Sequence, residues 1–290
     1  PYLRKHGRVD VFLSGNNANL QVGLEPKFIS KGLSLHYASN GGLDYQKLIR
    51  QLALKRLYKE AQSLPLRSYD LVINDFEPIT ALAAKLQKVP SIGFGHQASF
   101  QSRKTLRAGN FNPIGNWILS HFVKSNKYIG LHFDSFDENV FQPIIKEEVI
   151  QAVPINDGHI TVYLPQFSIE FLEPYLLEKK NFHFEVFTKE VNKITCKKNI
   201  TFFPIKNDQF TSSLIRCYGI ITAGGFETPA EAMFMNKKIL CIPICNHYEQ
   251  ECNGKSLENM GVKVLKKLDA HFDAFFHSWV TDTKPVKLDL

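Results

Sequence analysis

The chain has 290 residues, 44% of them hydrophobic and 22% charged, with a formal net charge of +7. This composition is typical of globular proteins and argues against a disordered chain. Charge or proline interrupts the longest apolar runs well before they reach the length of a membrane span. The length favours two domains.

The cysteines indicate the redox environment of the chain. They are odd in number and show no paired CxxC spacing: Cys196, Cys217, Cys241, Cys245 and Cys252. This pattern favours a reducing cytosol over a disulfide framework or a zinc site. We therefore expect a cytoplasmic protein with no cofactor and no metal site.

The positive charge is concentrated in the first half. Residues 1–152 hold 19 Lys and Arg against 12 Asp and Glu, whereas residues 153–290 hold 16 of each. Within the first half, residues 78–133 contain no acidic residue and seven basic ones: Lys85, Lys88, Arg103, Lys104, Arg107, Lys124 and Lys127. Such a surface either meets an anionic partner or is a solvated basic face. The sequence leaves both interpretations open.

In the first half, short β-rich runs alternate with amphipathic segments. The pattern predicts strands at Val9–Gly15, Tyr69–Asp75, Val89–His96 and Tyr128–Phe133, and helices at Asp44–Leu64 and Pro78–Gln87. The opening "PYLRKHG" is typical of the end of a helix, and no strand with a Gly-rich turn precedes it. We therefore expect that the first strand of the N-terminal domain is missing and that the true N-terminus has been lost or excluded.

The polar segment Asp137–Gly158, with two prolines, predicts the linker between domains. A fresh α/β series follows. Its expected strands are His159–Pro165, His183–Thr188, Asn199–Pro204, Tyr218–Thr222 and Lys237–Pro243, and its expected helices are Ile169–Lys180, Phe210–Arg216, Pro229–Asn236 and Glu249–Gly261. We predict an α/β fold with two Rossmann-like, doubly wound parallel-sheet domains, residues 1–152 and 153–290, that face each other across a cleft.

One strand–helix junction has the composition of an anion site. In "TAGGFETPAEA" (Thr222–Ala232), Gly224 and Gly225 allow the backbone to approach a ligand closely. The next helix points free N–H groups and its positive dipole end at the turn, where a phosphate binds well. We expect Thr228 to cap that helix and Pro229 to open it. Glu231, one turn further on, would accept hydrogen bonds from a ribose diol.

That junction alone is weak support for a site. Two glycines before a helix are more often an ordinary turn, and the junction lacks both the third glycine of a dinucleotide fingerprint and the lysine of a P-loop. A polar cluster follows the next strand, where parallel sheets bind ligands: His247, Glu249, Gln250, Glu251 and Asn253. Its amides and carboxylates suit sugar hydroxyls, although acidic residues also favour helix starts.

The segment "TAGGFETPAEAMFMNKKILCIPICNHYEQECN" (residues 222–253) resembles the nucleotide-sugar donor segment of GT-B glycosyltransferases, closest to MurG-like bacterial enzymes. The resemblance implies a GT-B architecture. It also implies a donor site in which Gly224, Gly225, Phe226 and Thr228 hold the diphosphate, Glu231 binds the ribose, Ile205 reads the base, and His247, Glu249, Gln250 and Glu251 line the sugar. The pair Gln250–Glu251 departs from the MurG pattern, which has Gln at the second place, so the sugar is left open.

The resemblance also implies the reaction. Such an enzyme transfers a sugar from a nucleotide, here expected to be UDP, to a hydroxyl of a cell-envelope or lipid-linked glycan, with inversion and without a metal. The usual base is a His in a Gly-rich turn that would precede Pro1. His96, at the end of a strand, is a substitute candidate for the base. A structural or acceptor-orienting role for His96, beside Gln97, is favoured over that of the base.

The segment Ser99–Lys127 mixes basic and aromatic residues. Arg103, Lys104 and Arg107 suit an anionic membrane at the inner face or an anionic lipid-linked acceptor. They also suit a solvated surface. For the apolar residues we expect a core position: Trp117, Ile118, Leu119 and Phe122. No nucleic-acid-binding motif accompanies the charge, so we expect no nucleic-acid partner.

Two other functions share these features. A UDP-N-acetylglucosamine 2-epimerase has the same two lobes and a similar cleft. A non-catalytic nucleotide-sugar-binding protein is favoured if the native chain starts at Pro1. A nicotinamide dehydrogenase is disfavoured because the glycine fingerprint is absent.

Overall fold

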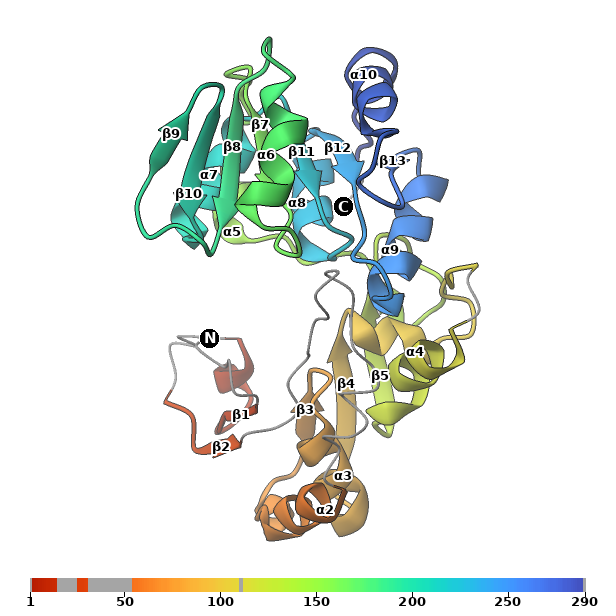
Figure 1. Cartoon of the computed structure of the whole chain (residues 1–290). Coiled ribbons are helices and arrows are strands. Elements are labelled where there is room, and N and C mark those ends of the chain that lie inside the picture. The colour runs from red at the N-terminus through yellow and green to blue at the C-terminus, as the bar shows by residue number, and fades with distance from the viewer. Residues whose placement is uncertain (1, 15–24, 31–53, 110–111, 289–290) are drawn as a thin grey trace.

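The computed structural model describes residues 2–14, 25–30, 54–109 and 112–288. Figure 1 shows two α/β bodies, here called the N-terminal lobe and the C-terminal lobe, each built on its own main sheet. The predicted α/β fold with parallel sheets is confirmed. The expected N-terminal part of the helix Asp44–Leu64 falls largely outside the described residues, which contain its end as α2 (Leu54–Ser63).

The N-terminal lobe contains a four-stranded parallel sheet in the order β3-β4-β5-β6. Its strands are β3 (Val72–Asn74), β4 (Ser91–Gly95), β5 (Lys127–Leu131) and β6 (Val140–Phe141). A separate parallel pair joins β1 (Phe12–Ser14) to β2 (Phe28–Ser30). Helices α2 and α3 (Pro78–Gln87) pack together through a cluster that includes Leu57, Ala61, Ile79 and Ala83. A 3-10 turn (Gln97–Gln101), the short α4 (Pro113–Trp117) and a π-helical turn (Ile118–Phe122) complete the lobe.

Helix α3 has the bounds that the sequence predicts, because both its ends are marked. The carboxylate of Glu77 accepts hydrogen bonds from the N–H groups of Ile79 and Thr80, and Pro78 occupies the first turn. The helix ends at Lys88, which adopts the left-handed conformation with φ 58°. Its N–H bonds the carbonyls of the last turn.

The C-terminal lobe holds a seven-stranded sheet in the order β13-β12-β11-β7-β8-β10-β9, in which only the β9–β10 pair is antiparallel among the described strands. The strands are β7 (Ile160–Tyr163), β8 (Phe184–Thr188), β9 (Thr195–Lys197), β10 (Ile200–Pro204), β11 (Gly219–Thr222), β12 (Lys238–Cys241) and β13 (Lys263–Val264). The helices are α6 (Ile169–Leu177), α7 (Asn207–Arg216), α8 (Glu227–Phe234), α9 (Tyr248–Asn259) and α10 (Phe272–Asp282).

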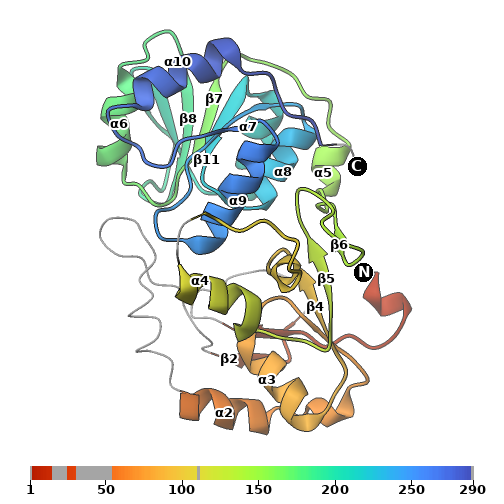
Figure 2. The same ribbon diagram turned by 90° about the vertical axis from the view of Figure 1, so that its right-hand side faces the viewer.

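Helices cover both faces of this sheet. Along β11, Ile220 belongs to one buried cluster and its neighbour Ile221 to another, because successive strand residues point to opposite faces. One cluster contains Trp279 of α10, and the other contains residues of α7, α8 and α9. Figure 2 shows α6 and α10 on one side of the strands and α7, α8 and α9 on the other. The lobe is therefore doubly wound, as predicted.

Four details differ from the sequence prediction. The proposed linker contains β6 and a short helix, α5 (Glu147–Ile150), whose Val149 is buried against the C-terminal lobe. The apolar run Tyr69–Asp75 predicts a buried strand, but β3 lies at the sheet edge and Ile73 is 44% exposed. Strands β2, β9 and β13 and helix α10 were not predicted. Helix α8 begins at Glu227, so the predicted Thr228 cap and Pro229 start are wrong; Pro229 fits inside the first turn, where no intrahelical N–H bond is lost.

Candidate active site

The glycine junction lies at the switch point of the C-terminal sheet. Strand β7 pairs with β8 on one side and with β11 on the other, so the strand order reverses between β7 and β11. Ligands of doubly wound sheets bind beyond the carboxyl ends of strands at such a point. Gly224 and Gly225 follow the end of β11 directly and precede the N-terminus of α8.

The two glycines have different surroundings. A Cβ atom on Gly224 would lie 2.6 Å from the backbone oxygen of Gln250, whereas one on Gly225 would meet nothing within 4 Å. The N–H of Gly224 donates to Gln250 Oε1 (3.1 Å), and its carbonyl accepts from Asn253 Nδ2 (3.0 Å). Gly224 therefore fixes the turn against α9, and Gly225 faces open space.

The N–H groups of Gly225 and Phe226 make no hydrogen bond with a described residue. They sit at the positive end of α8, where the first turn of the helix adds further free donors. This arrangement can hold an anionic group by backbone amides alone.

Glu231 is buried and paired with the linker. Its side chain contacts Lys146, whose Nζ lies 3.1 Å from Glu231 Oε1. Burial raises the pKa of the Glu231 carboxyl, and the Lys146 ammonium opposes that rise. The carboxylate is 3% exposed but points at a cation rather than into hydrocarbon. The sequence analysis did not anticipate Lys146.

The expected sugar pair uses its oxygens internally. Gln250 Oε1 accepts from the N–H groups of both Gly224 and Ile244, and Glu251 Oε1 accepts from the N–H of Asn246. Gln250 therefore presents its Nε2 group, which makes no hydrogen bond with a described residue. His247, at the N-terminus of α9, is buried, and burial lowers its pKa to about 4.

Glu249 instead faces the N-terminal lobe. Its Oε1 accepts from Gln97 Nε2 (3.2 Å) and lies 3.8 Å from His96 Nε2. Burial raises the pKa of Glu249 to about 7 and lowers that of His96 to about 4, so His96 is neutral at pH 7 and its contact with Glu249 is not a strong ion pair. Glu249 is thus a carboxyl group at the seam between the lobes with a pKa near neutrality.

His96 connects the two lobes. Its Nε2 lies 2.9 Å from Asn253 Oδ1 and its Nδ1 lies 2.9 Å from the carbonyl of Leu131. Its ring stacks on Phe226 with centroids 4.1 Å apart. Because both nitrogens face acceptors and the ring is buried, the geometry gives His96 the character of a positioning residue.

Asp75, near Glu227 and Glu249 of the C-terminal lobe, was not predicted as a site residue. It follows β3 at its carboxyl end, and the residue as a whole is exposed. Its carboxyl group lies against Gly95, where a Cβ would meet Oδ1 at 2.7 Å. Burial of the carboxyl and the nearby Glu227 carboxylate both raise its pKa. The signal was present in the sequence, since an acid ends the strand motif "YDLVIND".

The remaining predicted residues lie at two other places. Ile205, at the end of β10, is exposed beyond the stacked rings of Phe203 and Phe187. Arg103 and Lys104 are exposed. Arg107 turns inward, where Nη2 donates to the Phe100 carbonyl (2.6 Å), so it is the least available of the predicted basic surface residues.

The apolar part of the basic segment differs from the prediction. Leu119 is buried as expected, but Trp117 is 54% exposed, so its predicted core position is wrong. Trp117 ends α4, which packs on α9 through Gly115 and Tyr248 and leaves its outer face open.

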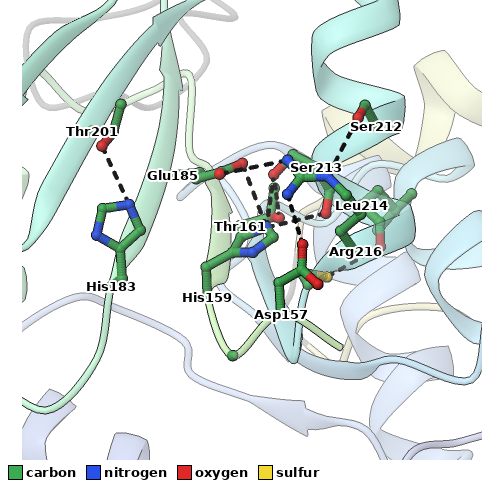
Figure 3. Close-up of polar contacts among 12 residues, drawn as sticks. Asp157, His159, Thr161, His183, Glu185, Thr201, Ser212, Ser213, Leu214 and Arg216 are labelled. Carbon is green, nitrogen blue, oxygen red and sulfur yellow. Dashed lines mark hydrogen bonds and ion pairs between the residues drawn. The ribbon is translucent and has the colours of Figure 1, made fainter. Parts of the chain in front are cut away.

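A second polar cluster lies at the opposite, amino end of the C-terminal sheet (Figure 3). His159 Nε2 lies 3.3 Å from Ser213 Oγ and 3.4 Å from Glu185 Oε2. Both partners face the same ring nitrogen, whereas a catalytic triad uses both nitrogens. Ser213 is buried, so the cluster has a structural role.

A model of the family described as "Glycosyl transferase family 1" matches residues 27–278. The chain belongs to this family. It is a glycosyltransferase of the GT-B type that uses a nucleotide sugar. No curated protein matches the chain.

Solved structures agree with the GT-B fold. A kitacinnamycin glycosyltransferase aligns with TM-score 0.63 and 12% identity over 97% of this chain and 85% of its own. UGT89C1 of Arabidopsis thaliana aligns with TM-score 0.61 and 14% identity over 97% and 85%. MurG of Acinetobacter baumannii aligns with TM-score 0.55 and 15% identity over 97% and 84%. At these identities the likeness concerns the fold.

No helix among the described residues is long and apolar enough to cross a bilayer. No group of three or more His, Cys, Asp or Glu side chains in the described ranges is arranged to hold a metal ion.

Proposed function

We propose that this glycosyltransferase moves a sugar from a UDP-sugar to a hydroxyl of a cell-envelope or lipid-linked glycan, with inversion and without a metal ion. The observation that carries the proposal is the junction at Gly225. It is open, its N–H is unpaired among the described residues, and it lies at the helix N-terminus of the switch point. Arabidopsis UGT89C1, which has a similar fold, was solved with UDP.

The donor diphosphate occupies the Gly225 end of the junction. The amides of Gly225 and Phe226 and the N-terminus of α8 bind its oxygens. As the glycosidic bond breaks, negative charge grows on the diphosphate, and these fixed dipoles stabilise it without rearranging. Gln250 and Asn253 keep the turn rigid, which makes the amides ready before the donor arrives.

The nucleoside extends along the C-terminal lobe. Glu231 binds the ribose diol through the carboxylate oxygen that Lys146 does not contact, and the Lys146 ammonium favours the ionised form of this buried carboxyl. Ile205 packs beside the base at the end of β10. Glu249 and the Nε2 group of Gln250 bind sugar hydroxyls.

The acceptor is deprotonated from the N-terminal lobe. Asp75 is the exposed carboxylate at the end of β3, and its raised pKa makes it a better proton acceptor than an ordinary aspartate. His96 and Gln97 hold the facing edge of α9 through Asn253 and Glu249. In this assignment His96 positions the site and Asp75 takes the proton.

The acceptor side includes an exposed apolar surface. Trp117 and Ile114 of α4 are 54% and 46% exposed, and Arg103 and Lys104 are exposed in the same basic segment. Aromatic and basic residues of this kind suit the interface of an anionic membrane at the cytoplasmic face. This supports a lipid-linked acceptor.

The test combines binding with product analysis. UDP and UDP-N-acetylglucosamine are titrated calorimetrically into the wild type and into Gly225→Ala and Glu231→Gln variants. Both variants are expected to weaken both ligands. Unchanged affinity for UDP in both variants would remove the donor assignment.

Turnover separates the proposed transfer from its alternatives. UDP release that requires an added acceptor supports transfer. Isomerised UDP-sugar without acceptor indicates an epimerase, and binding without turnover indicates a binding protein. Asp75→Asn is expected to lower kcat roughly 100-fold or more while UDP affinity is retained, and normal kcat would exclude Asp75 as the base.

A further inference from the structure

The N-terminal lobe has a basic cavity far from the cleft. It measures about 480 Å³, and its lining includes Lys85, Lys88, Ser91, Lys124, Ser125 and Asn126. Lys85 and Lys88 come from the end of α3, whereas Lys124 and Asn126 immediately precede β5. Ser91 begins β4. The cavity therefore lies at the amino ends of parallel strands whose carboxyl ends carry Asp75 and His96.

The three lysines carry uncompensated charge. None of Lys85, Lys88 and Lys124 forms an ion pair or a side-chain hydrogen bond within the described ranges. No Asp or Glu occurs between residues 78 and 133, so the surrounding sequence supplies no counter-charge. Three exposed ammonium groups around one concave site attract an anion.

The lysines do not serve as helix caps either. The last carbonyls of α3 accept from backbone N–H groups, since Lys88 N bonds the carbonyls of Ala84 and Lys85, and Val89 N bonds that of Ala84. Lys88 also stands in the left-handed conformation, with φ 58°, where glycine or asparagine fits better.

The lining adds uncharged donors. Asn126 Oδ1 accepts from the N–H and the hydroxyl of Ser91, so its Nδ2 group is left without a partner among the described residues. The buried hydroxyl of Ser125 likewise has no hydrogen-bond partner in that part of the chain. Ammonium, amide and hydroxyl donors together match the several acceptor oxygens of a phosphate group.

We propose that this cavity is a binding site for a phosphate-bearing ligand, separate from the donor site. Its volume exceeds that of a single phosphate, so it takes a phosphomonoester or a diphosphate with part of the attached group. The ligand is either a soluble phosphorylated compound or the headgroup of a phospholipid. Both sources present the same oxygens to the three lysines.

The experiment titrates inorganic pyrophosphate into the full chain by calorimetry, with the donor site weakened by Gly225→Ala in every protein that is compared. A parallel arm measures co-sedimentation with phosphatidylcholine vesicles that contain or lack phosphatidic acid. The test variant is Lys85→Gln/Lys124→Gln, which leaves the strained Lys88 in place. The matched control is Lys266→Gln/Lys267→Gln, which removes the same charge from exposed lysines of the C-terminal lobe.

We expect the wild type and the control variant to bind with the same affinity, and the test variant to bind at least roughly tenfold more weakly. Loss in the pyrophosphate arm identifies a soluble ligand, and loss confined to phosphatidic acid vesicles identifies a lipid headgroup. Asn126→Asp provides a second variant, since it keeps the oxygen that Ser91 needs and adds a negative charge. Binding of neither probe, or equal binding by the test and control variants at unchanged Tm, would overturn the proposal.

Discussion

The two glycines of the donor junction predict opposite outcomes for the same substitution. A methyl group on Gly224 would lie 2.6 Å from the Gln250 backbone oxygen and 3.0 Å from Gln250 Cβ. The turn and α9 must move apart, which strains the bonds from Gln250 to the N–H groups of Gly224 and Ile244. Overpacking of this kind costs about 1–3 kcal/mol. In a chain of this size that corresponds to a fall in Tm of roughly 2–10 °C.

Gly225→Ala is the matched control for stability and the test variant for binding. Its methyl group meets nothing within 4 Å, so Tm should stay within about 1 °C of the wild type. The methyl group does occupy the open side of the turn, where the diphosphate is proposed to bind, so the Kd for UDP should rise. Thermal denaturation by circular dichroism and UDP calorimetry measure the two effects. Equal Tm losses in both variants, or a wild-type Tm for Gly224→Ala, would refute the reasoning.

Three further predictions concern buried charge. Lys146→Met leaves the Glu231 carboxylate unpaired, so urea unfolding should show a loss of about 1–3 kcal/mol at pH 8 that shrinks towards pH 5; a pH-independent loss would contradict this. Because the pKa of Glu249 is raised to about 7, its contribution to stability is present below pH 4.5 and is lost as pH rises to 7. Glu249→Gln should remove that loss, at most about 3 kcal/mol, and an unchanged pH profile would argue against a raised pKa. Burial lowers the pKa of His159, so its contribution to the free energy of unfolding is lost as pH falls below 6.5. His159→Gln should therefore flatten the acid side of the plot of unfolding free energy against pH.

Local signals in the sequence were sufficient for most of the fold. The bounds of helix α3 were predicted to the residue, because residues within or next to the helix mark both its ends, with Pro78 in the first turn. The glycine junction was placed correctly for the same reason, since strand, glycines and helix follow one another. The start of α8 was missed by two residues, because Glu227 begins the helix without any side-chain cap to mark it.

Contacts between distant segments could not be predicted in this way. The pairing of Lys146 with Glu231 depends on the path of the linker over α8, and no local pattern encodes that path. Gln250 has the residue type of a sugar ligand, but its oxygen instead accepts from two backbone N–H groups that are near only after β12 and α9 have packed. Residue type indicated a polar site, and the tertiary structure decided which atoms are still available.

The two ring nitrogens of His96 face two hydrogen-bond acceptors, the Asn253 side chain and the Leu131 carbonyl. Asn253 donates through Nδ2 to the Gly224 carbonyl, so its Oδ1 must accept from His96 Nε2–H. The other ring nitrogen faces the Leu131 carbonyl at 2.9 Å, yet a neutral imidazole has only one proton to donate. Burial lowers the pKa of His96 to about 4 and so opposes the second proton. At neutral pH the Leu131 carbonyl therefore receives no proton from this ring, whereas the His96–Asn253 hydrogen bond that joins the N-terminal lobe to the junction is formed. The position of Asn253 thus selects the Nε2–H form of His96, and the cost of the second contact falls within the N-terminal lobe.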